Sequence, residues 1–129
     1  MKLYHGTSYD NAISICSEKS FLGNFKYSHT YGEGCKHIEE LNKEDGVVYF
    51  SNKFDFVNIN YCNNEKDCII AIELDDEYIH SIKEIDSEYT HGDEEEFFAD
   101  VVDTNGNMKI IGIYDENGEY QEDWEEWCF

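Results

Sequence analysis

Blocks of apolar residues along the chain predict several short β-strands and few helices. The clearest block is 68–74, where β-branched residues run almost without a polar break, and 108–114 has the same character. Two further blocks, 46–51 and 96–102, combine β-branched with aromatic side chains, which also favours strands.

The first part of the chain predicts a strand, a helix and then a long loop. The alternation over 2–5 predicts a short strand that Gly6 ends, and Ser8 or Asp10 is placed to cap the following helix. Residues 24–45 are polar and predict a long loop, and loops of this length in compact domains are usually functional.

Later segments add a second helix, two turns and an aromatic tail. The apolar spacing in 55–62 fits a short helix, while 104–107 and 116–118 are rich in turn-forming residues. Trp124 and Trp127 are expected to pack on the core.

These elements predict one α+β domain. Strands outnumber helices. The pattern lacks the regular strand–helix–strand alternation that is typical of a parallel sheet. The 129 residues contain no linker and no internal repeat, so a single domain over 1–129 is expected.

Charge is the strongest compositional signal. The chain has 30 acidic residues against 9 basic ones, none of which is arginine, and a formal net charge of −21. Such a surface repels nucleic-acid phosphates, so direct nucleic-acid binding is not expected, whereas basic proteins are attracted to it. A plainer interpretation, in which the acids only keep a small protein soluble, stays open.

The remaining composition points to a cytoplasmic protein. No apolar run is long enough for a membrane span, and no secretory signal is present, so no membrane partner is expected. The five cysteines are an odd number and are expected to be reduced thiols.

Three separated motifs carry groups suited to breaking a glycosidic bond in a dinucleotide. They are His5-Gly6-Thr7 on the first strand, Tyr49-Phe50-Ser51 on the second, and Glu94-Glu95-Glu96 at a late strand. A histidine can bind a ribose hydroxyl, and a glycine lets a ligand approach the backbone. Tyrosines offer flat faces to a nicotinamide ring, and a carboxylate can stabilise an oxocarbenium-like centre.

The order and wording of these motifs resemble the His-Tyr-Glu branch of the ADP-ribosyltransferases, which includes the poly(ADP-ribose) polymerases and diphtheria-type toxins. The resemblance covers the chain in patches from Leu3 to about Tyr114. It implies a split β-sheet core with a few short helices, within the α+β class, and NAD as the co-substrate.

The resemblance also implies roles for the first two motifs. His5 would grip the adenosine ribose, and the Gly6 backbone would read the nicotinamide carboxamide, next to Thr7. Tyr49, with Ser51 beside it, would contact the nicotinamide ring. Polymerase-type members have Gly-x-Tyr-Phe, whereas here one extra residue separates Gly46 from Tyr49.

The same resemblance assigns residues later in the chain. Tyr61 would stack on the nicotinamide ring, and Asn58 stands where the polymerases have a serine that contacts the carboxamide. Glu96 fits the catalytic acid best, acting with His5 and Tyr49 of the first two motifs. Because Glu94, Glu95 and Glu96 are consecutive, the register of the catalytic acid is open by one. Branches of the superfamily that depend on arginine are set aside, since the chain has none.

The function implied is NAD-dependent mono-ADP-ribosylation of a macromolecule with release of nicotinamide. The acidic charge favours a basic, nucleic-acid-binding protein as the target. For a stand-alone transferase this small, the resemblance implies a toxin, an effector or a phage counter-defence factor, and an anti-CRISPR transferase belongs to that group. Such a protein is expected to act in the cytoplasm of the producing or infected bacterial cell. Two alternatives stay open: a non-catalytic acidic mimic of nucleic acid on the same fold, and an NAD glycohydrolase.

Other groupings of reactive residues are weaker. His29, Cys35 and His37, with Cys16 or Cys62, have metal-ligating side chains, but their spacing matches no standard zinc finger and no metal is expected. Cys35 with His37 as a nucleophile pair lacks any evident orienting group or oxyanion hole.

Overall fold

The computed structural model describes residues 1–21, 47–55, 57, 67–81 and 96–127. Its centre is a six-stranded sheet in the order β4-β5-β2-β1-β3-β6, and every pair of neighbouring strands is antiparallel. With the helices that accompany it, this sheet confirms the predicted α+β class. The strands are β1 (Lys2–Ser8), β2 (Val47–Ser51), β3 (Asp67–Glu73), β4 (His80–Ser81), β5 (Glu96–Asp100) and β6 (Lys109–Tyr114).

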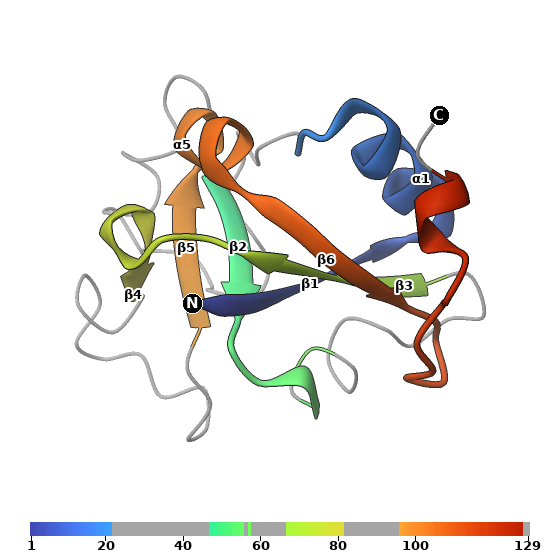
Figure 1. The fold of residues 1–129 in the computed structure, drawn as a ribbon. Coiled ribbons are helices and arrows are strands. Elements are labelled where there is room, and N and C mark those ends of the chain that lie inside the picture. The colour runs from blue at the N-terminus through green and yellow to red at the C-terminus, as the bar shows by residue number, and fades with distance from the viewer. Residues whose placement is uncertain (22–46, 56, 58–66, 82–95, 128–129) are drawn as a thin grey trace.

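The sheet consists of two sections that meet at a single residue pair. In the β1–β3–β6 section, all seven residues of β1 pair with β3, and β3 pairs with β6. In the β2–β5–β4 section, the five residues of β2 pair with β5. Between the sections, Tyr4 and Ser51 are the only paired residues of β1 and β2, both of which are fully described. Figure 1 shows β2 and β5 running across the direction of β1 and β3.

Helix α1 (Tyr9–Glu18) begins directly after β1. The Ser8 hydroxyl accepts a hydrogen bond from the Asn11 amide, which makes Ser8 the N-cap and decides between the two predicted caps. The helix buries Ala12, Ile15 and Cys16, and it ends at Lys19, which adopts a left-handed backbone conformation. One apolar side of the helix therefore faces the core.

The main core lies against one face of the sheet. It contains Leu3 of β1, Val48 and Phe50 of β2, and Ile70 and Ile72 of β3. The side chain of Trp124, at the start of the short 3-10 helix η3 (Trp124–Trp127), packs against this core as expected. Figure 1 shows η3 beside α1.

Two predicted strand boundaries are wrong. Gly6 does not end the first strand, because β1 continues to Ser8 and Gly6 pairs with Ile69 of β3. The block 96–102 is a strand only as far as Asp100.

The residues after Asp100 form helix α5 (Val101–Asn107) instead of a strand end and the predicted turn at 104–107. The Asp100 carboxylate accepts a hydrogen bond from the Val102 amide at 2.9 Å, and the Thr104 hydroxyl donates to the Asp100 carbonyl at 2.9 Å. This N-cap starts a helix despite the two valines that follow it.

The other predicted segments are settled in part. After β3 come the 3-10 helix η2 (Asp76–Tyr78) and then β4. The turn at 116–118 is present, with Gly118 at a φ of 78° and its amide bonded to the Asp115 carbonyl. Most of the helix expected over 55–62, and all of the loop expected over 24–45, lie outside the described residues.

One cysteine departs from the expectation of reduced thiols. Cys16 is disulfide-bonded, whereas Cys68 of β3 carries a buried thiol. A disulfide requires two Cα atoms within about 7 Å of each other. The sequence positions of five cysteines do not give these distances, so they do not determine which cysteines pair.

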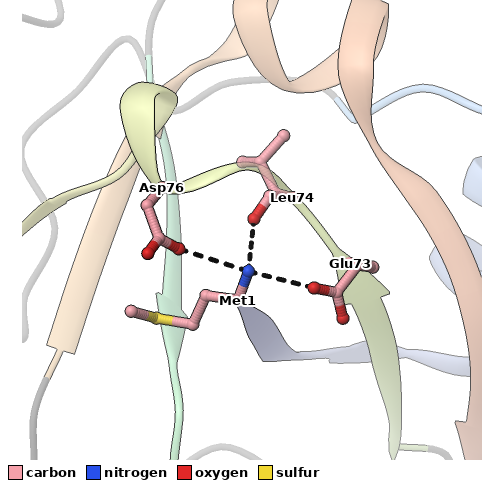
Figure 2. A network of polar contacts seen from close by, with 4 residues as sticks. All are labelled: Met1, Glu73, Leu74 and Asp76. Carbon is pink, nitrogen blue, oxygen red and sulfur yellow. Dashed lines mark hydrogen bonds and ion pairs between the residues drawn. The ribbon is translucent and has the colours of Figure 1, made fainter.

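The amino group of Met1 holds the start of β1 to the end of β3, as Figure 2 shows. It donates to the Leu74 carbonyl at 2.7 Å and lies 3.0 Å from Glu73 and 3.3 Å from Asp76. The hydrogen bond with Glu73, opposed in part by desolvation, raises the pKa of this amino group above its ordinary value.

None of the helices in the described part of the chain has the length and apolar character needed to cross a lipid bilayer.

Candidate functional site

A pocket of about 310 Å³ opens where β1 and β2 separate. Beyond the Tyr4–Ser51 pair the two strands form no further pairs, so the backbones of His5-Gly6-Thr7 and Val48-Tyr49 no longer face each other as ladder neighbours. These two stretches line the pocket. The volume is at the lower end of the range of about 300–1,000 Å³ that is typical of ligand sites.

His5 spans this opening with its side chain. Its Nδ1 lies 2.8 Å from the carbonyl oxygen of Tyr49, and since a carbonyl can only accept, Nδ1 carries the hydrogen. Burial lowers the pKa of His5 below its ordinary value, which keeps the ring neutral near pH 7. The lone pair of the neutral ring is therefore on Nε2, which can accept a hydrogen bond from a ligand hydroxyl.

Two aromatic rings hold the His5 ring in place. The rings of Phe21 and Phe50 contact it edge-on, with centroids 4.9 Å and 5.8 Å away, and they contact each other at 5.7 Å. These packed rings restrict the orientation of the imidazole, which is one requirement for a preorganised binding group.

The backbone of Phe21 is held by the side chain of Asn105 from helix α5. The Phe21 amide donates to Asn105 Oδ1 at 2.7 Å, and Asn105 Nδ2 donates to the Phe21 carbonyl at 3.1 Å. Asn105 belongs to α5, the helix that follows β5. This two-bond clamp therefore connects the chain after α1 to the β2–β5–β4 section, next to the pocket.

Helix α1 supplies a polar wall that the sequence analysis missed. Asn11, Ser14 and Glu18 line the pocket together with Ile15. Their spacing places them on one side of a helix, so the polar side of α1 faces the pocket while Ala12 and Cys16 face the core. This spacing was visible in the sequence.

Ser51 and Glu96 lie two residue pairs beyond Tyr49 along the β2–β5 ladder and do not line the pocket. They are paired with each other across β2 and β5, and their side chains are 1% and 3% exposed. Glu96 shares a face of the sheet with Tyr49, its diagonal neighbour, at a Cα separation of roughly 7–8 Å. The carboxylate is thus close to the strand that forms one side of the opening.

Four of the expected site residues are thereby placed at the pocket, and two more form a buried pair beside it. The pocket gathers His5, Gly6, Thr7 and Tyr49, while Glu96 and Ser51 form the adjacent buried pair. Asn58 and Tyr61 lie outside the described residues, as do Glu94 and Glu95, so the register of the acid run is described at Glu96 alone.

The residues of the two weaker groupings cannot be placed either. His29, Cys35, His37 and Cys62 fall outside the described ranges. Within those ranges, no group of histidine, cysteine and acidic side chains is arranged to hold a metal ion.

The pocket offers neutral donors and acceptors and one carboxylate. No lysine is among the described residues that line it, and the neutral His5 adds no positive charge. Its polar groups are the Asn11 amide, the Thr7, Ser14 and Ser20 hydroxyls, and the Glu18 carboxylate. Such a lining suits a ligand part rich in hydroxyl groups, for example a ribose, with apolar contacts from Ile15, Phe21 and Val48.

No protein-family model, curated protein or solved structure matches this chain. The interpretation of the site therefore depends on its own geometry and chemistry.

Proposed function

We propose that this protein is an NAD-dependent ADP-ribosyltransferase that modifies a basic macromolecule. The observation that carries the proposal is the pocket at the opening between β1 and β2, since it gathers His5, Gly6, Thr7 and Tyr49 from two separate motifs. A sheet divided at the Tyr4–Ser51 pair is also what the split core of these enzymes requires.

The pocket fits one nucleoside half of NAD. The Nε2 lone pair of His5 accepts a hydrogen bond from a ribose hydroxyl, and Asn11 and Ser14 provide further polar groups on the facing wall. Gly6 has no side chain to keep a carboxamide away from the backbone. The rest of the dinucleotide must extend beyond this cavity.

Glu96 is the acid that we assign to the reaction. In the transfer, the bond between C1′ of the ribose and the ring nitrogen of nicotinamide breaks, and its electron pair leaves with nicotinamide. Positive charge then develops on the ribose, and a buried carboxylate stabilises that charge more strongly than a solvated one. The acceptor attacks C1′ with a lone pair and loses its proton.

The charge of the chain supports a basic macromolecule as the acceptor. With 30 acids against 9 basic residues, the protein attracts basic partners and repels free nucleic acid. In the described part of the chain, the ion pairs between a carboxylate and a described cation are those of the Met1 amino group. We propose that exposed acids such as Asp123, Glu125 and Glu126 contact this partner, a nucleic-acid-binding protein of a bacterial cell.

Labelled NAD and a bacterial lysate test the proposal. Wild-type protein is compared with Glu96→Gln, which keeps the shape of the buried side chain, and with Glu122→Gln, which removes one exposed charge. We expect wild type and Glu122→Gln to label one or a few proteins, and Glu96→Gln to be slower by about 10²–10³-fold, the usual cost of losing one electrostatic group at a reacting centre.

Other results would contradict the proposal. Equal labelling by wild type and Glu96→Gln would contradict the assignment of Glu96 as the catalytic acid. Release of nicotinamide without labelled protein would indicate an NAD glycohydrolase. No turnover and no NAD binding by any of the three proteins would reject the enzyme.

The net charge of −21 supports a second candidate function, a non-catalytic acidic inhibitor of a nucleic-acid-binding protein. That inhibitor would act stoichiometrically without NAD, would weaken with added salt, and would be unaffected by Glu96→Gln.

A further inference from the structure

A second cavity, of about 250 Å³, lies on a different face of α1 from the His5 pocket. Its described lining is formed by the end of α1, the start of β6 and the C-terminal tail: Cys16, Lys19, Met108, Lys109, Ile110 and Trp124. None of these residues belongs to the site proposed above, so the cavity is a separate feature of the surface.

The walls of this cavity are apolar. Met108, Ile110 and Trp124 pack against the main core but remain partly exposed. The Trp124 ring is fixed in position, because its Nε1–H donates to the Tyr120 hydroxyl at 3.0 Å. A large, oriented aromatic side chain of this kind offers a flat contact surface at little cost in side-chain entropy.

Both charged residues that line the cavity are lysines. Only four of the lysines are described, and Lys19 and Lys109 are two of them. Neither has a carboxylate within ion-pair distance in the described part of the chain, although the protein carries 30 acids. Two lysines without an ion pair in the described part of the chain thus line one largely apolar cavity in a strongly acidic protein, and Glu73 is the cross-strand partner of one of them, Lys109.

Lys19 also occupies an unusual backbone position. Its φ of 55° is the only positive value of a non-glycine residue among the described residues. Glycine is the usual residue where a helix ends in this conformation, and a lysine there is strained. A cation near a helix C-terminus is favourable because of the helix dipole, but that explanation does not cover Lys109 on β6.

We propose that this cavity binds a small amphipathic anion, a molecule with an apolar body and one carboxylate, sulfonate or phosphate group. The apolar body contacts Met108, Ile110 and Trp124, and the anionic group lies between the ammonium groups of Lys19 and Lys109. The inference does not depend on the proposed transferase function.

The test uses a pair of dyes that differ in charge. Anilinonaphthalene sulfonate is anionic, and phenylnaphthylamine has the same ring system without the sulfonate; both become fluorescent in apolar sites. The full-length protein is titrated with each dye, and energy transfer from tryptophan reports binding near Trp124. We expect saturable binding of one anionic dye per chain, and weaker binding of the uncharged dye.

Matched variants locate the binding site. Lys19→Gly removes the cation while placing the preferred residue at the left-handed position, so this variant is expected to fold at least as stably as wild type. Combined with Lys109→Gln, it should weaken binding of the anionic dye by about tenfold, since each exposed charge pair contributes modestly. Lys53→Gln, at an exposed lysine that does not line the cavity, is the control and should bind like wild type.

The outcomes separate clearly. Equal binding of the two dyes, no saturable binding, or equal weakening by Lys53→Gln would overturn the proposal. Loss of anionic-dye binding in the double variant, with unchanged binding of the uncharged dye and an unchanged urea midpoint, would support it.

Discussion

The two sections of the sheet bury different kinds of residues. In β3 the five residues from Cys68 to Ile72 are all buried, and all are apolar. The β2–β5–β4 section instead buries Ser51 and Glu96 as a direct pair, and these are the buried polar side chains on the described strands. The β2–β5–β4 section also buries apolar residues (Val48, Phe50, Phe97, Phe98 and Ala99), so the sections differ in the polar pair that the second one buries beside them.

This difference explains where the candidate site lies. β1 pairs with β3 along its whole length, so its other edge can separate from β2 without loss of the strand. The apolar section thus holds His5, Gly6 and Thr7 in place, and the polar section contributes Tyr49 to the pocket, while Glu96 lies beside the pocket without lining it. Rigid support on one side and polar groups on the other are what a preorganised site requires.

The largest expected effect tests the stabilising role of β3. Ile72 is fully buried and pairs with Leu3 on one side and Ile110 on the other. Ile72→Ala should lower the free energy of unfolding by about 2–5 kcal/mol, because it removes buried methyl groups and leaves a cavity. Urea unfolding followed by circular dichroism measures this change.

The smaller substitution Ile72→Val is its control and should cost about 0.5–1.5 kcal/mol. If both substitutions cost less than about 0.5 kcal/mol, the β1–β3–β6 section is not the stabilising part of the sheet, and the comparison fails.

A second prediction tests the connection between the sections. Asn105→Ala removes both hydrogen bonds to the Phe21 backbone, and at about 0.5–1.5 kcal/mol for each bond it should cost about 1–3 kcal/mol. Because Phe21 packs on His5, we also expect the His5 imidazole signals to shift in NMR spectra recorded at constant pH.

Asn107→Ala is the matched control for this substitution. It removes a hydrogen bond from Asn107 Nδ2 to the Asp103 carbonyl within the same helix, at an exposed position. Its stability cost should be smaller, and the His5 signals should stay where they are. A shift of equal size in both variants would mean that the clamp does not position His5.

The smallest expected effect is the pH dependence of the Met1 contacts. Hydrogen bonding to Glu73 raises the pKa of the amino group above its ordinary value of about 8.0. Because the folded pKa exceeds the unfolded one, this stabilisation is complete below about pH 8 and is lost as the pH rises through the folded value.

Urea midpoints at pH 7 and pH 10 measure this contribution, with Nα-acetylated protein as the control that lacks the charge. Wild type should lose more stability over this interval than the acetylated protein. Equal losses would show that the ion pairs with Glu73 and Asp76 add nothing to the β1–β3 connection.

The sequence predicts β2, β3 and β6 better than the end of β1 and the segment after β5. The run at 68–74 matches β3 closely, because consecutive β-branched residues favour a strand that is buried on both faces. Gly6 was misinterpreted as a strand end, since pairing with β3 outweighs the intrinsic cost of a glycine in a strand. Local patterns do not contain this tertiary contribution.

Helix α5 shows the opposite failure. Two valines predicted a strand through Val102, and Asn105-Gly106 predicted a turn, yet Asp100 caps a helix there. An aspartate at the N-cap with another acidic residue, Asp103, in the first turn is a helix-start signal, and it was present in the sequence. The competing β-propensity of the valines hid it.

For the candidate site, the motif residues could be named from the sequence but their surroundings could not. His5, Gly6, Thr7 and Tyr49 were expected to act together, and they line one pocket. The Asn105 clamp was not foreseeable, because it joins residues 84 positions apart through a helix that was not predicted.

The clamp on Phe21 also predicts which substitutions homologous sequences should tolerate at positions 21 and 105. Both hydrogen bonds between the Asn105 side chain and residue 21 involve backbone groups, which every amino acid except proline provides in full. Among homologous sequences, position 105 should therefore remain asparagine whatever stands at position 21, and the two positions should not covary. Position 21 itself should exclude proline but tolerate exchange among large aromatic residues. Its side chain packs on His5, whereas its hydrogen bonds with Asn105 use the backbone.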